Sequence, residues 1–262
     1  MTKEYTALGL MSGTSGDGVD ASIIQSDGQN KYKVILDKYF KYDKDTCKNI
    51  HELKENINNS KDLKNLSKEI KELEKKITLF HTGVVEDFSG SSIDFLGFHG
   101  QTIFHNADEK TSRQLGDGKL LSQLTKKNVV CNFRENDLRN GGQGAPLTPI
   151  FHKLLVHQKK INLPVTILNI GGIANITSIQ KENKIFSSDI GPGNCLIDKW
   201  IRLNSNKNYD DKGSFAKAGK INKIILDQSL ENFFESGINK KKSYDIKDFD
   251  LSFVRGLSLE DG

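Results

Sequence analysis

Cysteine and long apolar runs are scarce in this 262-residue chain. Its three cysteines, Cys47, Cys131 and Cys195, lie far apart and form no C-x-x-C pair, so neither a zinc motif nor a disulfide framework is indicated. No run of eighteen apolar residues predicts a membrane span, and the opening MTKEYTALGLM is apolar over too short a stretch for a signal peptide. We therefore expect idle thiols in a reducing compartment and a cytoplasmic location.

Neither sign of charge dominates. The 38 Lys and Arg residues against 34 Asp and Glu residues leave a net charge of +4, and the lysines are interleaved with Glu, Asp and Asn. Because no basic block forms, nucleic-acid binding is not indicated. Hydrophobic residues make up 35% and charged residues 27%, which is ordinary for a globular protein, and the length suits one large domain or two modest ones.

A Gly-rich stretch, LGLMSGTSGDGVDASII at residues 8–24, stands between two apolar runs. It lacks the Lys-Ser/Thr pair of a P-loop, and the alternation after Gly18 predicts a strand where P-loops and dinucleotide fingerprints open a helix. The glycines free the backbone, and Ser12, Thr14 and Ser15 add hydroxyl groups. This composition suits an anion-binding loop between two strands; an ordinary hairpin turn is the alternative.

The rest of the first half predicts another strand and then helices. KYKVILDKYFKY supplies a third strand of a meander, and residues 45–88 carry apolar positions at helical three- and four-residue steps, with Ser60 placed to cap. A strand over 93–105, a short helix over 119–126 and the apolar strand NVVCNF follow. Polar residues come where these strands end.

The second half repeats the opening plan. The strand VTILN, the turn IGGIAN, the strand NITSI, the turn QKEN and the strand KIFSSD follow one another as in the first meander, and the turn DIGPGN adds a third small-residue loop. Such duplication is far more informative than one loop. Two hairpin loops that grip a nucleotide's phosphates are typical of the actin, hexokinase and sugar-kinase class. We therefore predict an α/β, ribonuclease H-like, duplicated two-lobed fold with a mixed sheet in each lobe, an N-terminal lobe over 1–132 and an incomplete C-terminal lobe over 133–262.

Six motifs make the prediction specific. They are, in order, MSGTSGDGVD (11–20), HGQT (99–102), QLGD (114–117), GGQGAPLTPIFH (141–152), NIGGIANIT (169–177) and DIGPGN (189–194). With this order and spacing the chain closely resembles the anhydro-N-acetylmuramic acid kinases, bacterial enzymes of peptidoglycan recycling. DKGSFAKAGKI (211–221) and KSYDIKDFD (242–250) continue the resemblance, which covers nearly the whole chain.

The resemblance implies a cytoplasmic kinase that uses Mg²⁺ and converts 1,6-anhydro-N-acetylmuramate, ATP and water to N-acetylmuramate 6-phosphate and ADP. Its partner would be this small sugar, with neither nucleic acid nor membrane involved, and a homodimer is expected because family members are often dimeric. Two other hypotheses stay open. One is a non-catalytic nucleotide- or sugar-binding module of the same fold; the other is a different actin-like sugar or acetate kinase, which would share the duplication but not HGQT or GGQGAP.

The resemblance also assigns a nucleotide site, in which the ATP phosphates meet the amides and hydroxyls of two opposing loops. The residues are Gly13, Thr14, Ser15, Gly16, Asp17, Gly18, Val19 and Asp20 in the first loop and Gly171 and Gly172 in the second. Because the first loop has no Lys, Mg²⁺ and oriented amides are expected to stabilise the charge.

Asp189 matches the family's catalytic aspartate. It would act as general base and draw a proton from the water that attacks the anomeric carbon, while O6 of the sugar moves onto the γ-phosphate. The alternative is a turn-capping aspartate before Gly191 and Pro192.

Sugar contacts are expected from polar residues where strands end in loops. The candidates are His99, Gln101, Asp117, Arg134 and Gln143. Arg134 has a guanidinium suited to pair with the lactyl carboxylate of a muramyl sugar. Loop hydrogen bonding is the alternative for His99 and His105. Metal ligation by these histidines is not expected, because no carboxylate or third His stands at suitable spacing, and no metal-ligating residue is assigned.

The chain departs from the family's pattern at three places. Gly16 stands where the family usually has a larger apolar residue, which is expected to loosen the loop. Asn132 stands where the family usually has Asp, so a charge near the substrate region is missing. The closing LSLEDG, with Ser258 in a capping position, predicts the first turn of a helix that does not follow; we expect a C-terminally truncated chain with poor solubility and weak ATP affinity.

Overall fold

The computed structural model describes residues 3–182, 184–235, 243–254 and 256–262. The chain divides into two compact units, one made of residues 1–165 with 179–185 and the other of residues 166–178 with 186–262. Each unit is described by itself. The boundary after residue 132 stays a prediction. Asn183 of the predicted turn QKEN and Lys242 of the motif KSYDIKDFD lie outside the described residues.

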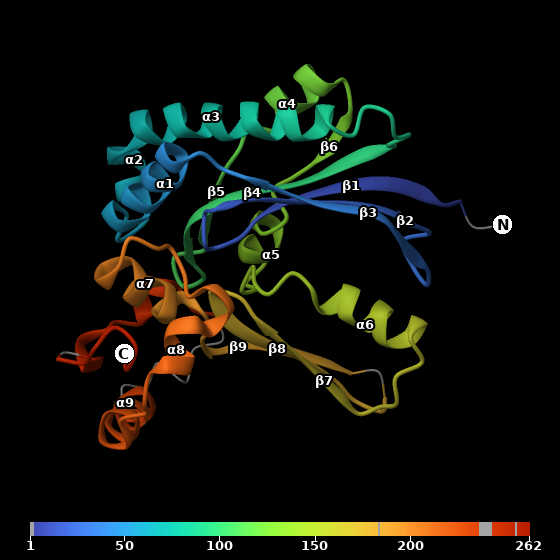
Figure 1. Ribbon diagram of the computed structural model, residues 1–262. Helices are drawn as coiled ribbons and strands as arrows, with labels where there is room; N and C mark the ends of the chain where they lie inside the picture. The colour runs from blue at the N-terminus through green and yellow to red at the C-terminus, as the bar shows by residue number, and fades with distance from the viewer. Residues whose placement is uncertain (1–2, 183, 236–242, 255) are drawn as a thin grey trace. The chain divides into compact units, whose positions relative to one another are not determined.

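The first unit is built on a mixed sheet (Figure 1). Its strands are β1 (Tyr5–Ser12), β2 (Gly18–Ser26), β3 (Tyr32–Lys41), β4 (Phe95–Asn106), β5 (Thr111–Leu115) and β6 (Asn128–Val130). β1, β2 and β3 form an antiparallel meander, as predicted, whereas β4 runs parallel to β1 and β6 runs parallel to β4. β5 folds back antiparallel on the second half of β4.

This strand order identifies the fold class. In the order β3-β2-β1-β4-β6, the three antiparallel strands of the meander are followed by two strands that run parallel to β1. β5 forms a hairpin with β4. The parallel step from the meander to β4 needs a long crossover, and helices supply it. The mixed α/β, ribonuclease H-like plan predicted for the N-terminal lobe is therefore confirmed.

Helices cover the sheet of the first unit. They are α1 (Lys44–Asn56), α2 (Asp62–Asn65), α3 (Ser67–Glu86), α4 (Gly118–Thr125), α5 (Glu135–Arg139) and α6 (Pro149–Gln158). α3 and α4 lie over one face of the sheet in Figure 1. The predicted helical segment is confirmed, but Ser60 does not cap it: α2 follows Lys61, α3 follows Leu66, and the Ser60 N–H donates to Glu109 instead.

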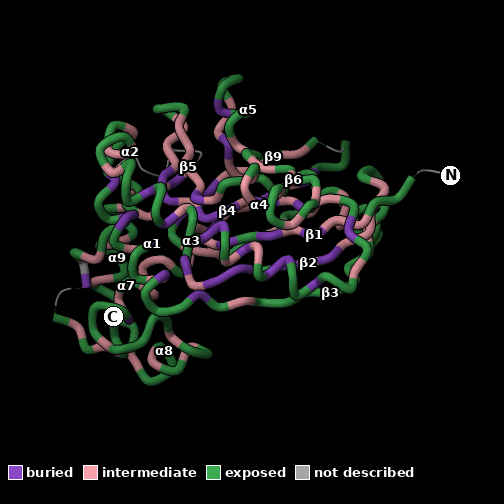
Figure 2. The backbone as a smooth tube through the Cα atoms, turned by 90° about the horizontal axis from the view of Figure 1, so that it is seen from above, coloured by how far each residue is buried: buried purple, intermediate pink, exposed green. Residues whose placement is uncertain are grey.

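The core of this unit lies between the sheet and helices α1, α3 and α4. Figure 2 shows buried positions along β1, β2 and β4. Leu8, Leu10 and Val19 from the meander pack with Ile50 of α1 and Ile77 of α3 in one apolar cluster. Alternation along the strands and the three- to four-residue apolar spacing of the helices therefore meet in a single core.

The second unit contains most of a three-stranded sheet in the order β7-β8-β9. Its strands are β7 (Val165–Ile170), β8 (Ile173–Ile179) and β9 (Ile185–Pro192); its helices are α7 (Cys195–Asn204), α8 (Ser214–Ala218) and α9 (Lys223–Glu235), with 3-10 turns at Asp211–Gly213, Ile246–Asp248 and Ser252–Val254. The repeated strand pattern is confirmed. The prediction of a turn at DIGPGN was wrong for its first four residues, because β9 continues through Pro192.

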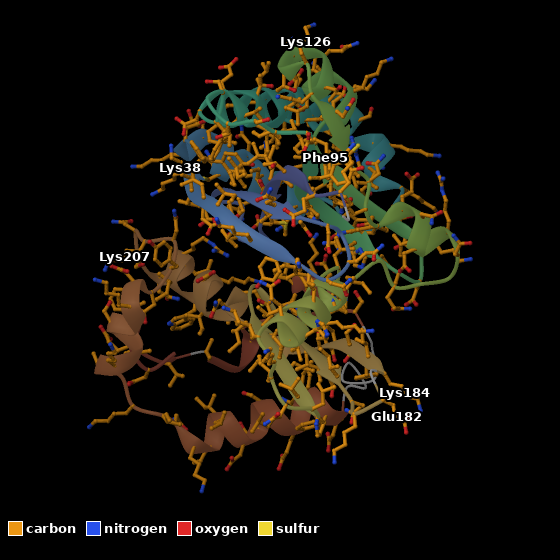
Figure 3. The ribbon with its side chains drawn as sticks, turned by 90° about the vertical axis from the view of Figure 1, so that its right-hand side faces the viewer. Lys38, Phe95, Lys126, Glu182, Lys184 and Lys207 are labelled. Atoms are coloured by element: carbon orange, nitrogen blue, oxygen red, sulfur yellow. The ribbon has the colours of Figure 1, made fainter. Side chains whose placement is uncertain are left out.

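The charged side chains are distributed over the surface. Lys38 and Lys126 lie at the periphery in Figure 3, and Lys38 pairs with Asp87. Lys184 pairs with Glu182 at 2.6 Å. Among the described residues, no helix combines the length and apolar character that crossing a bilayer requires.

Candidate functional site

The first Gly-rich loop, residues 13–17, joins β1 to β2 through a tight turn. The Gly16 N–H donates to the Gly13 carbonyl at 3.2 Å, and Gly16 has a φ of +64°, which favours glycine. Thr14 and Ser15, the central residues of the turn, are exposed, whereas Gly16 is buried. Val19, also predicted for this site, places its side chain in the core.

Buried side chains from two other elements anchor this loop. The Gln101 Nε2 of β4 donates to the Gly13 carbonyl at 2.9 Å, and the Lys54 Nζ of α1 donates to the Thr14 carbonyl at 2.8 Å. The Tyr42 N–H donates to the Asp17 carbonyl at 2.9 Å. The structure thus gives the loop a lysine that lies outside the loop sequence.

Lys54 is not among the residues predicted from the sequence, although the pattern of α1 contains a signal for it. Ile50 and Leu53 belong to the buried stripe of α1, and Lys54 follows Ile50 by four residues on the same face. A lysine within an apolar stripe must place its ammonium against a polar partner, which here is the loop.

A buried polar cluster supports the start of the loop. The Ser12 hydroxyl lies 2.7 Å from the Tyr42 hydroxyl and 3.5 Å from His81 Nε2. His81 Nδ1 lies 2.8 Å from the Ile77 carbonyl, to which it can only donate. Burial lowers the pKa of His81 to about 4, so the ring is neutral at pH 7 and the cluster ties β1 to α3 without a charge.

Two carboxylates stand at the end of the loop. Burial and the neighbouring Asp17 carboxylate raise the pKa of Asp20. Asp17 accepts a hydrogen bond from the Ser15 hydroxyl, and burial together with this carboxylate raises the pKa of Tyr39. The end of the loop is therefore locally acidic, in a position where a cation would be stabilised.

At the other predicted loop, Arg134 bridges β4 to the GGQGAP segment. Its Nη1 donates to the Gly144 carbonyl at 2.6 Å, and its Nη2 lies 3.0 Å from His99 Nε2. His99 Nδ1 lies 2.7 Å from the Gly100 carbonyl. Burial, together with Arg134, lowers the pKa of His99 to about 4, so the ring accepts from the guanidinium and donates to the carbonyl.

His105 and Gln143 lie in the same cluster. His105 Nδ1 is 2.9 Å from the Ser112 hydroxyl, and burial and Arg134 lower the pKa of His105 to about 4, while a hydrogen bond with the Gln143 backbone opposes that shift. Asp137 accepts from the Gly144 N–H at 2.7 Å and so fixes the loop from its other side. The structure thus brings His99, Arg134 and Gln143, three of the residues predicted to contact a sugar, into one cluster with His105.

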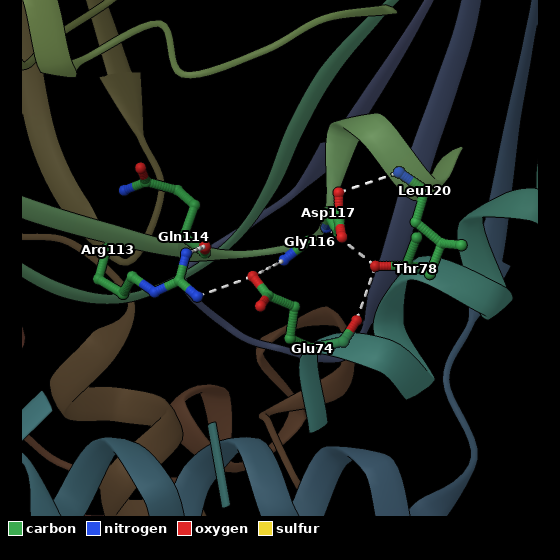
Figure 4. A network of polar contacts seen from close by, with 7 residues as sticks. All are labelled: Glu74, Thr78, Arg113, Gln114, Gly116, Asp117 and Leu120. Carbon is green, nitrogen blue, oxygen red and sulfur yellow. Dashed lines mark hydrogen bonds and ion pairs between the residues drawn. The ribbon is translucent and has the colours of Figure 1, made fainter. Parts of the chain in front are cut away.

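Asp117 lies in a separate network (Figure 4). Its Oδ1 accepts from the Leu120 N–H at 2.9 Å, which makes it the N-cap of α4. Its own N–H donates to the Thr78 hydroxyl at 2.9 Å, and that hydroxyl donates to the Glu74 carbonyl at 2.7 Å. Glu74 in turn pairs with Arg113 at 2.8 Å, so the structure gives Asp117 a bracing role between α3 and α4.

In the second unit, the backbone joins two small-residue loops. The Gly171 carbonyl accepts from the Asn194 N–H at 2.7 Å, and the Gly172 carbonyl accepts from the N–H groups of Gly193 at 3.0 Å and Cys195 at 3.2 Å. A side chain at position 193 would collide with the Gly171 carbonyl, so glycine is required there by this close approach. The loops predicted as separate form one backbone assembly at the start of α7.

Asp189 lies within β9 and is buried. Its Oδ2 accepts from the Tyr244 N–H at 2.9 Å, and the Tyr244 ring packs against Phe249 at a centroid distance of 5.3 Å. Burial, with the Asp189 carboxylate nearby, raises the pKa of Tyr244. The alternative of a turn-capping aspartate was wrong, because residues 185–192 are extended.

Comparison with known proteins agrees with these motifs. The family described as anhydro-N-acetylmuramic acid kinase matches residues 5–257. The kinase of that name from Pelagibacter ubique (strain HTCC1062) is 57% identical over 267 residues, covering 100% of this chain and 71% of the relative. The chain belongs to the anhydro-N-acetylmuramic acid kinase family. As kinases, members of this family use ATP.

More distant members of the family match the chain over nearly the same range. The relative from Zymomonas mobilis is 36% identical over 98% of this chain and 72% of its own length, and that from Rhizobium johnstonii is 37% identical over 98% and 71%. Among solved structures, ethanolamine utilization protein EutJ from Carboxydothermus hydrogenoformans matches with a TM-score of 0.34 and 13% identity over 82% of this chain and 61% of its own. The fold assignment rests on strand order and not on that likeness.

Proposed function

We propose that this chain is an ATP-dependent kinase of 1,6-anhydro-N-acetylmuramate that acts in peptidoglycan recycling. In the reaction the oxygen of water bonds to C1 of the sugar, the C1–O6 bond breaks, and O6 takes the γ-phosphoryl group of ATP. The products are N-acetylmuramate 6-phosphate and ADP. The observation that carries this proposal is the 57% identity to a kinase of that name over the whole chain.

The two glycine assemblies are proposed to bind the phosphates of ATP. Thr14 and Ser15 are exposed on a turn whose carbonyls are held by buried donors. The Gly171–Gly172 segment, whose carbonyls accept from the N–H groups of residues 193–195, is proposed as the second phosphate-binding stretch. Phosphate binding by such arrays of N–H groups needs no cationic side chain in the loop itself.

Mg²⁺ is proposed to bind at the acidic end of the first loop. Asp17 and Asp20 are close enough for one carboxylate to raise the pKa of the other, and Mg²⁺ in kinases is usually held by one or two carboxylates together with phosphate oxygens. The donor set therefore fits the ion. When bound, Mg²⁺ would neutralise charge that develops on the phosphates.

Asp189 is proposed to be the general base. Its Oδ2 is oriented by the Tyr244 N–H, and burial shields the carboxylate from bulk water, which would otherwise compete with the reacting water for it. Its task would be to take the proton from the attacking water as the C1–O6 bond opens.

The sugar is proposed to bind beside His99, Arg134 and Gln143. Arg134 carries a permanent positive charge that suits the lactyl carboxylate, and neutral His99 has both ring nitrogens defined by its neighbours. Gln101 and Asp117 have their described contacts within the protein, at the phosphate loop and the start of α4. We further propose a cytoplasmic location and a homodimer, in keeping with the metabolic role.

The test is turnover in ¹⁸O-water. The protein is incubated with Mg-ATP and 1,6-anhydro-N-acetylmuramate, and the product is analysed by mass spectrometry. We expect N-acetylmuramate 6-phosphate with one heavy oxygen at C1. Asp189→Asn should lower kcat by about 10²- to 10⁴-fold, the usual contribution of a positioned general base, with KM for ATP nearly unchanged.

The matched control is Asp227→Asn, which changes an exposed carboxylate of α9 in the same unit. It should leave kcat unchanged. Product without heavy oxygen at C1 would exclude attack by water, and an Asp189→Asn protein with full activity would remove Asp189 as the base. If wild-type protein makes no product, the kinase assignment of this chain fails.

A further inference from the structure

Two successive carbonyls of the first loop are held from the buried side. Gln101, with 0% of its surface exposed, binds the Gly13 carbonyl, and Lys54, with 8% exposed, binds the Thr14 carbonyl. The donors come from β4 and α1, which are far from the loop in sequence. The loop is thus gripped by its backbone oxygens on one side.

Because the peptide group is planar, the hydrogen bonds to these two carbonyls also fix the direction of the N–H groups of Thr14 and Ser15. The Gly13 carbonyl shares a planar trans peptide with the Thr14 N–H, and the Thr14 carbonyl shares one with the Ser15 N–H. In a trans peptide the carbonyl and the N–H point in opposite directions. Because both carbonyls face buried donors, the N–H groups of Thr14 and Ser15 face the opposite, exposed side.

These two N–H groups are available to a ligand. Neither donates a hydrogen bond within the part of the chain that the structure describes, whereas the next N–H, that of Gly16, is used by the turn. Adjacent N–H groups that converge in a turn form an anion-binding concavity. The exposed turn therefore offers two aligned donors to an anionic oxygen.

We propose that Lys54 and Gln101 are positioning residues that aim the Thr14 and Ser15 N–H groups at a phosphate oxygen of the nucleotide. This inference rests on the proposed kinase function for the identity of the anion, and on the two carbonyl contacts for the geometry. Lys54 acts from behind the loop, so it takes the place of a loop lysine without touching the phosphate. It also adds a positive charge below the anion site.

Both residues are retained at a cost to stability. The Gln101 Oε1 is buried and has no hydrogen-bond partner among the described residues, so its desolvation is uncompensated. Lys54 occupies the apolar stripe of α1 beside Ile50 and Leu53, where a hydrophobic side chain would pack without desolvating an ammonium. Buried polar groups that lower stability in this way are found mostly at functional sites.

The first test removes each donor and keeps the side-chain length. Lys54→Met and Gln101→Met are compared with Lys48→Met, an exposed lysine of α1, and Gln158→Met, a glutamine of α6 whose amide bonds the Tyr32 backbone. The measurements are the Kd for Mg-adenylyl imidodiphosphate, the Kd for the anhydro sugar, and kcat and KM for ATP. Circular dichroism and Tm establish that each variant is folded.

We expect each loop variant to weaken nucleotide binding and raise KM for ATP about tenfold, with sugar affinity unchanged, and the controls to behave as wild type. A folded Lys54→Met protein with wild-type nucleotide affinity overturns the role of Lys54; the same result for Gln101→Met overturns the role of Gln101. Equal losses of nucleotide and sugar binding would mean a general structural role and overturn the proposal.

The second test uses wild-type protein and needs no turnover. Sodium pyrophosphate is titrated into ¹⁵N-labelled protein, and the amide resonances of the loop are followed. We expect those of Thr14 and Ser15 to move downfield more than that of Gly16, which is already hydrogen-bonded. The proposal is overturned if pyrophosphate leaves Thr14 and Ser15 in place. Shifts here together with no product in the ¹⁸O assay would separate a valid anion site from a failed kinase assignment.

Discussion

Gly16 shows what a single residue reveals in sequence and in structure. From the sequence, glycine in place of a larger apolar residue predicts a looser loop, and this stays a prediction. In the structure Gly16 is buried with a φ of +64°, and a Cβ would lie 3.0 Å from the Ile50 methyl carbon Cγ2. Glycine therefore fits both the backbone conformation and the close packing of α1.

Gly16→Ala separates these two effects when it is compared with Gly28→Ala. Gly28 has a φ of +72°, and a methyl group added there would meet nothing within 4 Å, so its substitution reports backbone strain alone, about 1–2 kcal/mol. Gly16→Ala should lose about 1 kcal/mol more, because the methyl group presses on Ile50. Urea unfolding followed by circular dichroism measures the stability of both variants. Equal losses would show that Ile50 of α1 moves aside for the added methyl group at no cost in stability.

The resemblance to the family assigned Asp189 a role, the polar character of the loops made Arg134 a candidate, and neither signal pointed to Lys54. Asp189 and Arg134 lie in or near motifs that contain charged or polar residues. Lys54 lies in a helix forty positions from the loop residue that it binds. Its role depends on how α1 packs, and a single sequence records that packing only as a lysine in an apolar stripe.

For the secondary-structure elements, periodic patterns predicted that a helix or strand is present better than they predicted where it begins and ends. The meander and α3 follow from alternation and apolar spacing, and the structure confirms them. Ser60 failed as a cap because α2 begins one residue later, after Lys61, and both the N–H and the hydroxyl of Ser60 bind Glu109. The Gly and Pro residues of DIGPGN suggested a turn, but pairing with β8 extends β9 through most of it.

The capping role of Asp117 at the start of α4 can be tested directly by substitution. Asp117→Ala should lower stability by about 0.5–2 kcal/mol, because the Leu120 N–H loses its acceptor, whereas Asp117→Asn keeps an acceptor and should lose far less. If Asp117 only caps the helix, neither variant changes KM for the sugar. Thermal unfolding and steady-state kinetics on the same samples measure both, and a raised sugar KM in Asp117→Asn would restore its predicted contact with substrate.

For the whole molecule, the repeated strand-turn-strand plan was the most informative pattern. It predicted two sheets with Gly-rich first turns, and the structure has β1–β3 in one unit and β7–β9 as a second sheet. It did not predict that the carbonyls of Gly171 and Gly172 would bind the segment before α7, because that contact joins backbone groups whose direction no residue letter encodes.

The first unit should lose stability in mild acid. Burial lowers the pKa of His81 from its ordinary 6.5 to about 4, so between these values the unfolded chain binds a proton that the folded one does not. Stability from this residue is therefore complete above pH 6.5 and is lost as the pH falls towards 4, at up to about 1.4 kcal/mol per pH unit. His99 and His105, also lowered to about 4, act in the same direction.

Replacing His81 by phenylalanine tests this sign. The ring lies against Phe80 and Phe98, with centroids 6.4 and 4.9 Å away, so an aromatic residue that does not titrate fits the site. The free energy of unfolding, measured with urea at several pH values from 7.5 to 4.5, should fall less steeply for His81→Phe than for wild type. His157→Gln, an exposed change in α6, should keep the wild-type slope. If the unfolding free energy of His81→Phe depends on pH as steeply as that of wild type, His81 titrates normally in the folded protein. The assignment of a neutral His81 beside Ser12 and Tyr42 would then be wrong.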